Sequence, residues 1–380
     1  MRIQTEIGLL GNTFTGLSGK TKVDFGHGDA QYITFLNVLT HPTIDPTIFE
    51  RVNVKPNEKQ NLCKKGDLFF NTSSETPEEV GMCSCLNVNV PRLYLNSFCF
   101  GFRLKEDASA DSQYLAYFFR GKEGRQIMTM LAQGATRYNL SKENFMRTSI
   151  ELPPKPEQER IAAALTSIDS LIDNLERTIQ KKKNIREGAI EELLSGKRRL
   201  PGFSGEWVEK KFEEIFRTIS TREKGIDTKE YLPKGKFPII DQGQEGIVGY
   251  TYKENPIRVK DGGFIVFGDH TRIFKFVQYD FFVGADGTKV LSCCEGNFPM
   301  FIYFLCQKLN IPNTGYNRHF VYLKESIFYL PSDIHEQHAI ADTLTALDDE
   351  IALLQAERDK YQQIRSGMMD DLLTGKIRLQ

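Results

Sequence analysis

The feature that constrains this chain most is a segment that occurs twice. "EQERIAAALTSIDSLIDNLE", which begins at Glu157, aligns without a gap to "EQHAIADTLTALDDEIALLQ", which begins at Glu336, and the match continues to Leu200 and Leu379. Roughly eighteen of about forty-four aligned positions are identical, far more than chance provides, so the segment is an internal repeat. We therefore expect a chain made of two related halves.

Apolar residues in both copies recur at alternating spacings of three and four, which is the heptad pattern of a helix with one apolar seam. The pattern predicts one long helix per copy, each of roughly 38–40 residues and about 55–60 Å. The expected seam consists of Ile161, Leu165, Ile168, Ile172 and Leu175 in the first copy and of Ile340, Leu344, Leu347, Ile351 and Leu354 in the second.

Both copies also contain signals for the ends of their helices. Asp333 and Glu336 suit a capping box at the start of the second helix. Gly196 and Gly375 are expected to be the C-terminal caps, because glycine accepts the left-handed conformation found there. The basic residues after these glycines either cap helix carbonyls, contact a partner or help to close the molecule; they are Lys197, Arg199, Lys376 and Arg378.

The residues between the helices indicate two domains with a similar order of elements. We expect strands at 31–38, 66–71 and 97–104 with a helix at 112–133, and strands at 236–241, 262–269 and 287–293 with a helix at 297–309. The expected organisation is a domain at 1–150, a helix at 151–200, a domain at 201–330 and a helix at 331–380.

This pattern predicts an α+β chain with two mixed α/β domains joined by two long helices. The second domain is long enough to leave one helix and return to the other, so we expect an intramolecular antiparallel coiled coil in a pseudo-two-fold, pseudo-circular layout. The alternative is a coiled coil that only oligomerises the protein.

Composition excludes several protein classes. No apolar run is long enough to span a membrane, and the start "MRIQTEIGLLGNTF" does not have the pattern of a signal peptide, so we expect a cytoplasmic protein. The seven cysteines form no CxxC pair and are expected to be reduced. The net charge is −1, whereas a protein that binds DNA alone is usually more basic. Either DNA is not the partner, or positive charge is concentrated locally, or another subunit supplies it.

The sequence contains no complete catalytic or cofactor-binding motif. "GNTFTGLSGKT" has Phe14 where a nucleotide-binding P-loop requires glycine. No strand leads into GxGxxG, and no Asn-Pro-Pro-aromatic tetrapeptide of amino-methyltransferases occurs. "HEQH" at 335–338 lacks the spacing of a HExxH zinc motif. We therefore expect no enzyme activity, no cofactor and no metal.

The repeated segments resemble a known family. "LPPKPEQERIAAALTSIDSLIDNLE…LLSGKRRLPGFSGEW" and "LPSDIHEQHAIADTLTALDDEI…LLTGKIRL" are similar to the conserved regions of specificity subunits of type I restriction-modification systems, and "GDLFFNTSSETPEEVG" and "DQGQEGIVGYT…VFGDHTR…VGADGTKVL…GYNRHFVYLKES" resemble its target-recognition domains. The start lacks the Trp and basic lead-in of "GEWVEKKFEEIF", which opens the second half.

The resemblance implies a non-catalytic subunit that binds double-stranded DNA. Each recognition domain would read one half of a bipartite, asymmetric target, and the helices would set the gap between the halves. Two methyltransferase subunits would dock on this chain, and restriction subunits would join the complex. The basic run at 177–188 would be solvated, or would contact phosphates or the methyltransferase.

Four polar loops are the candidate DNA-binding segments, because hydroxyl, amide, imidazole and guanidinium groups suit phosphates and base edges. Polar turns or structural networks, such as Asp269 with His270 or Arg272, explain the same residues equally well. The candidates are Asn71, Thr72 and Ser73; Thr136, Arg137, Tyr138, Asn139 and Lys142; Asp269, His270, Thr271 and Arg272; and Tyr316, Asn317, Arg318 and His319.

Two further functions fit parts of the sequence. A methyltransferase with a fused recognition domain would require the catalytic motifs that are missing. A coiled-coil scaffold or regulatory DNA-binding protein without a methyltransferase partner would explain the near-zero charge, but not two divergent domains of matching layout.

Overall fold

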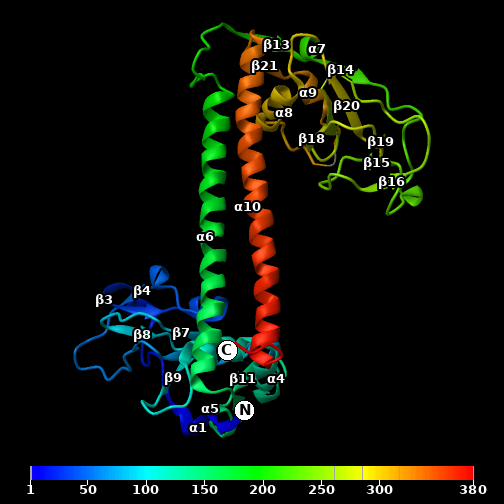
Figure 1. Cartoon of the computed structure of the whole chain (residues 1–380). Coiled ribbons are helices and arrows are strands. Elements are labelled where there is room, and N and C mark those ends of the chain that lie inside the picture. The colour runs from blue at the N-terminus through cyan, green and yellow to red at the C-terminus, as the bar shows by residue number, and fades with distance from the viewer. Residues whose placement is uncertain (1, 261, 285, 316, 380) are drawn as a thin grey trace. The chain divides into compact units, whose positions relative to one another are not determined.

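Two long helices and two compact units make up the structure, a computed structural model that describes residues 2–260, 262–284, 286–315 and 317–379 (Figure 1). The first unit comprises Met1–Leu175 and Glu357–Gln380, and the second comprises Glu176–Ala356. The helices α6 (Lys155–Leu193) and α10 (Ile334–Thr374) each contribute residues to both units. Across the ranges described, no helix is long and apolar enough to cross a membrane.

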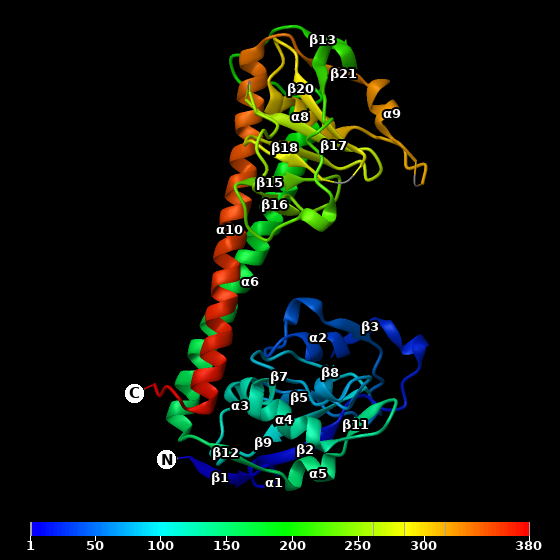
Figure 2. The same ribbon diagram turned by 90° about the vertical axis from the view of Figure 1, so that its right-hand side faces the viewer.

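The globular part of the first unit contains two main sheets. One has the strand order β2-β9-β5-β7, and these strands are labelled in Figure 2. The other has the order β4-β3-β8, in which β3 and β8 are parallel. The elements are β1 (Ile3–Glu6), α1 (Ile7–Leu10), β2 (Gly11–Thr15), η1 (Lys22–Asp24), β3 (Phe25–Ile33), α2 (Phe35–Thr40), η2 (Pro46–Ile48), β4 (Glu50–Val52), β5 (Leu68–Asn71), β6 (Ser73–Ser74), η3 (Pro77–Glu79), β7 (Cys83–Cys85), β8 (Leu93–Leu95), β9 (Cys99–Leu104), α3 (Ser112–Arg120), α4 (Lys122–Leu131), β10 (Ala132–Gln133), β11 (Tyr138–Leu140), α5 (Lys142–Arg147) and β12 (Ser149–Leu152).

The second unit repeats this topology. Its sheets have the orders β14-β20-β17-β18 and β16-β15-β19, and β15 and β19 are again parallel. The pairing of β1 with β12 before α6 also recurs as the pairing of β13 with β21 before α10. The elements are β13 (Trp207–Lys211), α7 (Phe212–Ile215), β14 (Phe216–Ile219), η4 (Thr228–Glu230), β15 (Phe237–Ile240), β16 (Gly249–Thr251), β17 (Phe264–Gly268), β18 (Phe274–Val277), β19 (Phe282–Val283), β20 (Thr288–Cys293), α8 (Pro299–Lys308), α9 (Phe320–Lys324) and β21 (Ile327–Pro331).

The expected α+β class, with two mixed domains and two long helices, is confirmed by these elements. Two local predictions are wrong. The strand expected at 31–38 ends at Ile33, because the Thr34 hydroxyl accepts a hydrogen bond from the backbone N–H of Asn37 and starts α2 instead. The helix expected at 112–133 is broken at Gly121 into α3 and α4, and its last two residues form β10.

The seam residues lie inside the helices as the heptads predict, but their burial differs between the two copies. All five in α6 are buried, as are Ile340, Leu344 and Ile351 in α10. Leu347 and Leu354 are only half-buried. The apolar seam of α10 is therefore less completely covered than that of α6.

Charged pairs join the two helices inside each unit at positions that the repeat relates. In the first unit Arg365 of α10 pairs with Asp169 of α6, and in the second unit Arg186 of α6 pairs with Asp348 of α10. Arg186 aligns with Arg365, and Asp169 aligns with Asp348. One interaction therefore occurs twice, with the donor helix exchanged, which explains these polar interruptions of the apolar seam.

The basic residue near the end of each repeat reaches the start of the other helix. Arg199 pairs with Glu336 in the second unit, and Arg378 donates to Glu157 at 2.6 and 3.0 Å in the first. The start of one helix thus lies beside the end of the other, so α6 and α10 are antiparallel within each unit. Both arginines thus pair with a glutamate of the opposite helix, and Lys197 and Lys376 lie near acidic residues of their own segment.

The capping box expected at the start of α10 is wrong, although Asp333 does cap the helix. Its carboxylate accepts from the backbone N–H of His335 at 2.9 Å. The Glu336 carboxylate does not return to the cap residue, because it pairs with Arg199. Gly196 and Gly375 have φ values of +69° and +75°, the left-handed conformation expected of C-terminal caps.

The glutamine that follows each of these glutamates fixes its helix to the adjacent domain. Gln158 accepts from the backbone N–H of Asp111 at 2.9 Å, and Gln337 accepts from that of Phe298 at 2.8 Å. Both glutamines are fully buried. The glutamate of each repeated Glu-Gln pair therefore links its helix to the end of the opposite repeat, and the glutamine links the same helix to the adjacent globular domain.

Candidate nucleic-acid interface

Three segments that are distant in the sequence meet at the end of β5 in the first unit. The backbone N–H of Thr72 donates to the carbonyl of Phe98 at 3.0 Å. On the other side, the N–H of Leu140 donates to the carbonyl of Thr72 at 2.9 Å. The β5 end, the β8–β9 turn and the segment before α5 are therefore neighbours.

The second unit builds the same junction at the end of β17. The N–H of Asp269 donates to the carbonyl of Gly287, and the N–H of His319 donates to the carbonyl of Asp269, both at 2.8 Å. In each unit the structure thus brings together the two polar loops that the sequence predicted. It also adds a third segment, the turn before β9 or β20, that the sequence analysis did not include.

A small sheet displays the candidates of the first unit. β6 and β11 pair so that Ser73 lies opposite Asn139 and Ser74 lies opposite Tyr138, and β10 extends the sheet. This sheet has no counterpart among the described strands of the second unit. Asn139 is exposed, and Ser73 and Tyr138 are half-buried, so all three residues are at least partly accessible to solvent.

Two basic candidates flank this sheet. Thr136 and Arg137 are exposed in the β10–β11 loop, and within the described part of the chain the Arg137 guanidinium has no ion-pair partner. Lys142 is half-buried, with its ammonium 5.6 Å from the centre of the Phe100 ring. The first unit therefore presents one free guanidinium and one partly sheltered ammonium beside neutral polar side chains.

Asn71 lies beneath this surface and is inaccessible. Its side chain is fully buried, accepts from the backbone N–H of Met82 at 2.6 Å and donates to the carbonyl of Glu79 at 2.9 Å. These bonds hold the loop between β6 and β7 against the end of β5. The burial and hydrogen bonds of the amide favour a supporting role for Asn71 over the expected direct contact with DNA.

Asp269 and His319 are buried supports in the second unit. Asp269 is 1% exposed, and its Oδ1 accepts from the backbone N–H of Phe320 at 2.7 Å. His319 is 0% exposed, and its Nδ1 lies 3.0 Å from the carbonyl oxygen of Asp269. These side chains join the two loops and do not face solvent, which favours supporting roles over the expected contacts with DNA.

Gln242, which the sequence analysis missed, organises the exposed part of the second junction. Its Oε1 accepts from the backbone N–H of His270 at 3.1 Å, and its Nε2 donates to the carbonyl of Asp286 at 2.9 Å. The Thr271 hydroxyl donates to the Gln242 carbonyl. A polar residue two positions after β15, in the glycine-containing loop "DQGQEG", was the available signal.

The remaining candidates of the second unit differ in accessibility. Asn317 and Arg318 are exposed, and the Arg318 guanidinium lies 3.6 Å from the exposed carboxylate of Asp286. Arg272 has φ +63°, and its Nη1 donates to the carbonyl of Ile311 at 3.1 Å, so this side chain is half-buried. Tyr316 lies outside the described residues.

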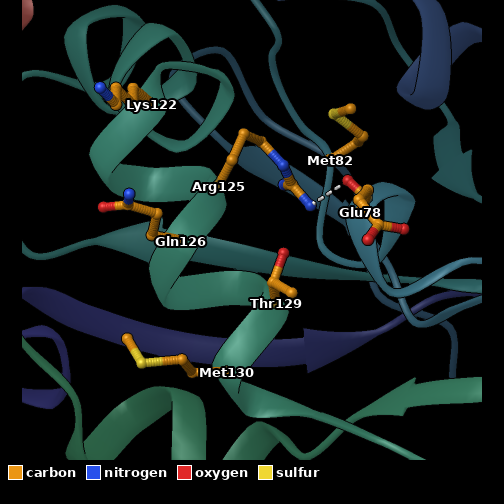
Figure 3. Close-up of a pocket in the computed structure, with 7 residues that line it drawn as sticks. All are labelled: Glu78, Met82, Lys122, Arg125, Gln126, Thr129 and Met130. Atoms are coloured by element: carbon orange, nitrogen blue, oxygen red, sulfur yellow. Dashed lines mark hydrogen bonds between the residues drawn. The ribbon is translucent and has the colours of Figure 1, made fainter.

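A hollow of about 640 Å³ opens beside the first junction, between α4 and η3 (Figure 3). Arg125 lies on one wall and donates to the backbone carbonyl of Glu78 at 2.7 Å. Burial lowers the pKa of this guanidinium. The walls of the hollow adjoin the candidate sheet in the chain, because α4 leads into β10 and η3 follows β6. Its other lining residues are Met82, Lys122, Gln126, Thr129 and Met130.

Three buried cysteines offer no reactive thiol. Burial raises the pKa of Cys83 and Cys306 well above the ordinary value and that of Cys99 to about 12, so these groups are protonated thiols at neutral pH. No cluster of three or more His, Cys, Asp or Glu side chains suited to a metal ion is found in the same described ranges.

Comparison with known proteins gives consistent matches. Residues 28–184 and 204–363 each match the family model described as the type I restriction modification DNA specificity domain. Two proteins of Methanocaldococcus jannaschii are similar over much of their length. One, provisionally named the type I restriction enzyme MjaX specificity subunit, is 23% identical over 97% of this chain and 91% of its own. The other, the type I restriction enzyme MjaVIII specificity subunit, is 22% identical over 71% of each chain.

A solved structure is similar in fold. The crystal structure of the type I restriction-modification system S subunit from M. genitalium superposes with a TM-score of 0.69 at 17% identity. The superposition covers 98% of this chain and 96% of that one. The similarity extends over both units and both long helices, and at this level of identity it bears on the fold.

Proposed function

Because this chain belongs to the type I restriction-modification DNA specificity family, with two copies of the specificity domain, we propose that each domain reads one half of a bipartite, asymmetric DNA target. The observation that carries the proposal is the repeated junction. In both units the same backbone hydrogen bonds bring three loops together, while the side chains on those loops differ. A shared frame with different displayed groups is suited to reading two different sequences.

The difference between the junctions supports an asymmetric target. The first junction displays Ser73, Tyr138 and Asn139 beside the exposed guanidinium of Arg137. The second displays His270, Asn317 and an exposed guanidinium at Arg318. Arginine favours guanine and asparagine favours adenine in the major groove. The two half-sites therefore differ in sequence, and the complete target is not a palindrome.

Charge supports a shared grip on the DNA. The chain has a net charge of −1, and one of its two exposed junction arginines, Arg318, lies beside a carboxylate. Non-specific affinity for DNA comes mainly from phosphate neutralisation, so this chain alone binds DNA weakly. The proposed partners are methyltransferase subunits, two per complex, together with restriction subunits, and these supply basic surface and catalysis.

The long helices are proposed to set the gap between the half-sites. α6 has 39 residues and α10 has 41, which corresponds to about 60 Å of helix. Sites read from one face of DNA are separated by about 34–36 Å or a multiple of it. Rods of this length, pinned by ion pairs in each unit, are long enough to hold two reading domains at such a spacing.

Methylation mapping with matched variants tests the proposal. The chain is expressed with a methyltransferase subunit encoded beside it, and methylated positions are read across the host genome. Asn139 and Arg318 occupy equivalent places, each directly before the residue that bonds to the end of the central strand. Asn139→Ala is expected to relax one half-site only, and Arg318→Ala the other only.

The same experiment separates the proposal from its alternatives. If both variants altered the same half-site, the assignment of one half to each domain would be wrong. If no split motif were methylated while the chain still assembled with other proteins, a scaffold function would be favoured instead.

A further inference from the structure

We propose that Phe98 contacts the C5-methyl group of one thymine in the half-site read by the first unit. The inference rests on the proposed function and adds a specificity-determining residue to it. Phe98 lies in the turn between β8 and β9, the third segment of the first junction. Its side chain belongs to the exposed large apolar groups of the protein, with 60% of the residue accessible to solvent.

Hydrogen bonds hold the backbone of Phe98 although its ring is exposed. The backbone N–H of Phe98 donates to Oδ1 of Asn96 at 2.8 Å. Asn96 is 6% exposed, and its Nδ2 donates to the carbonyl of Ile33 at 3.0 Å. On the other side, the Phe98 carbonyl accepts from both the N–H and the hydroxyl of Thr72, at 3.0 and 2.7 Å. A buried amide and a junction residue thus fix the backbone from which the ring projects.

The fold itself does not require an aromatic residue at this place. The equivalent position in the second unit is Gly287, whose carbonyl accepts from Asp269 as that of Phe98 accepts from Thr72. A side chain at Gly287 would approach His270, because an added Cβ would lie 2.9 Å from the imidazole Cδ2. The two domains therefore share the turn but differ in what it presents, which is an apolar ring in one and an open backbone in the other.

The chemistry beside Phe98 indicates a base edge as its contact. Thr72 lies directly across from it, and the next residue, Ser73, pairs with Asn139 in the candidate sheet. The major groove presents hydrogen-bonding groups and one apolar group, the thymine C5-methyl, which phenylalanine is able to contact. An exposed ring on a hydrogen-bonded turn, beside a polar sheet, is complementary to that combination. Intercalation and docking of a methyltransferase subunit are alternatives that the test distinguishes.

Removal of single methyl groups from the DNA tests the proposal. The purified complex of this chain with its methyltransferase subunits is titrated with a DNA duplex that contains the target motif found by methylation mapping. Binding is followed by fluorescence anisotropy at fixed salt. Each thymine of both half-sites, on either strand, is replaced in turn by deoxyuridine, which lacks only the methyl group. For the wild-type complex we expect about a 4-fold loss of affinity at one thymine of the first unit's half-site, the effect of one buried methyl group.

Three variants complete the test. Phe98→Ala is expected to bind the natural target about 4-fold more weakly or worse, and to show no further loss when that thymine becomes deoxyuridine. Phe98→Leu, which retains an apolar side chain, is expected to keep part of the sensitivity. Tyr252→Ala is the matched control, since Tyr252 is an aromatic residue of the second unit with 65% exposure, and it is expected to keep the full sensitivity.

Several results would overturn the inference. They are a half-site without thymine on either strand, or no thymine whose replacement by deoxyuridine weakens binding. The inference would also fail if Phe98→Ala lost as much affinity on that replacement as wild type, or if Phe98→Ala were defective only in assembly with the methyltransferase. An intercalating ring would instead give a loss of affinity that is independent of the methyl group. Failure of the wild-type complex to prefer a split target would count against the proposed function and not against Phe98 alone.

Discussion

Substitution of Arg199 by alanine should destabilise the second unit far more than the equivalent change at Arg378 destabilises the first. Both arginines pair with a glutamate at the start of the opposite long helix. The Glu336 side chain is 0% exposed and that of Arg199 is 26% exposed, whereas the values for Glu157 and Arg378 are 9% and 55%. The repeat therefore provides one interaction in two environments.

The magnitude follows from what each variant leaves behind. Removal of one partner of a buried pair costs about 3–5 kcal/mol, because the remaining charge stays buried. Glu336 lies in the first turn of α10, where the helix dipole offsets about 0.5–1 kcal/mol of this cost. Partial exposure of Arg199 reduces the cost further, so we expect about 2–3 kcal/mol for Arg199→Ala. The Arg378 guanidinium is 55% exposed, so solvent screens this pair more strongly, and we expect about 1 kcal/mol for Arg378→Ala.

The single tryptophan makes the assay specific to one unit. Trp207 is 8% exposed in β13 of the second unit, with the Arg199 guanidinium 5.7 Å from its ring centre. Urea unfolding followed by its fluorescence reports the second unit, and far-ultraviolet circular dichroism reports the whole chain. With a slope of about 2 kcal/mol per M, Arg199→Ala should lower the fluorescence midpoint by about 1–1.5 M.

Two results would refute this reasoning. An Arg199→Ala midpoint within about 0.3 M of wild type corresponds to a loss of unfolding free energy below about 0.6 kcal/mol at the slope above. Such a small loss would mean that the buried carboxylate needs no partner. Equal losses for Arg199→Ala and Arg378→Ala would mean that burial does not govern the strength of the pair. Glu336→Gln, tested alone and together with Arg199→Ala, controls for the missing positive charge, because the double variant should recover part of the loss.

Three further outcomes follow from the structure. The Arg378 hydrogen bond holds the pKa of Glu157 below its ordinary value of 4.5. The stability that this pair contributes is therefore present above about pH 4.5 and is lost as the pH falls through the folded-state pKa. The urea midpoints of wild type and Arg378→Met should converge below that folded-state pKa. In DNA titrations of the complex, Arg137→Ala should reduce the slope of log affinity against log salt by about 0.9. Arg198 is the control, because its guanidinium pairs with Glu192, and Arg198→Ala should leave this slope unchanged. Gly196→Ala should cost about 1–2 kcal/mol in Trp207-monitored unfolding, since φ is +69° and the added Cβ would lie 3.2 Å from the indole.

The sequence predicted the frame because its signals are local. Heptad spacing, glycine after the last turn and strand-forming runs depend on near neighbours, and all three reappear in α6, α10 and the central strands β5 and β17. The local predictions that failed were decided by competing short-range chemistry. Thr34 ended a strand by capping a helix, and Gly121 divided an apolar segment into two helices.

The junctions could not be predicted from sequence in the same way. Nothing in the sequence indicates that the Asn71–Ser73 and Thr136–Asn139 segments pair in one sheet, because that contact depends on tertiary structure. For the same reason polarity alone did not distinguish the buried Asp269 from the exposed Arg318. Phe98 was not among the predicted residues because only polar loops suggested DNA contact. The tertiary structure is needed to place its turn beside Thr72.

The central claim is that each domain recognises one half-site and that the two long helices set the gap between the half-sites. Lengthening both helices by one turn tests this claim most directly. Four residues are inserted after Leu175 and four after Ala356, the borders of the two units. Four residues add about 6 Å of helix, or about two base pairs of DNA.

Genome-wide methylation mapping of the variant is the decisive measurement. We expect both half-sites to keep their bases while the gap between them grows by about one or two base pairs. Altered half-site bases with an unchanged gap would contradict the account.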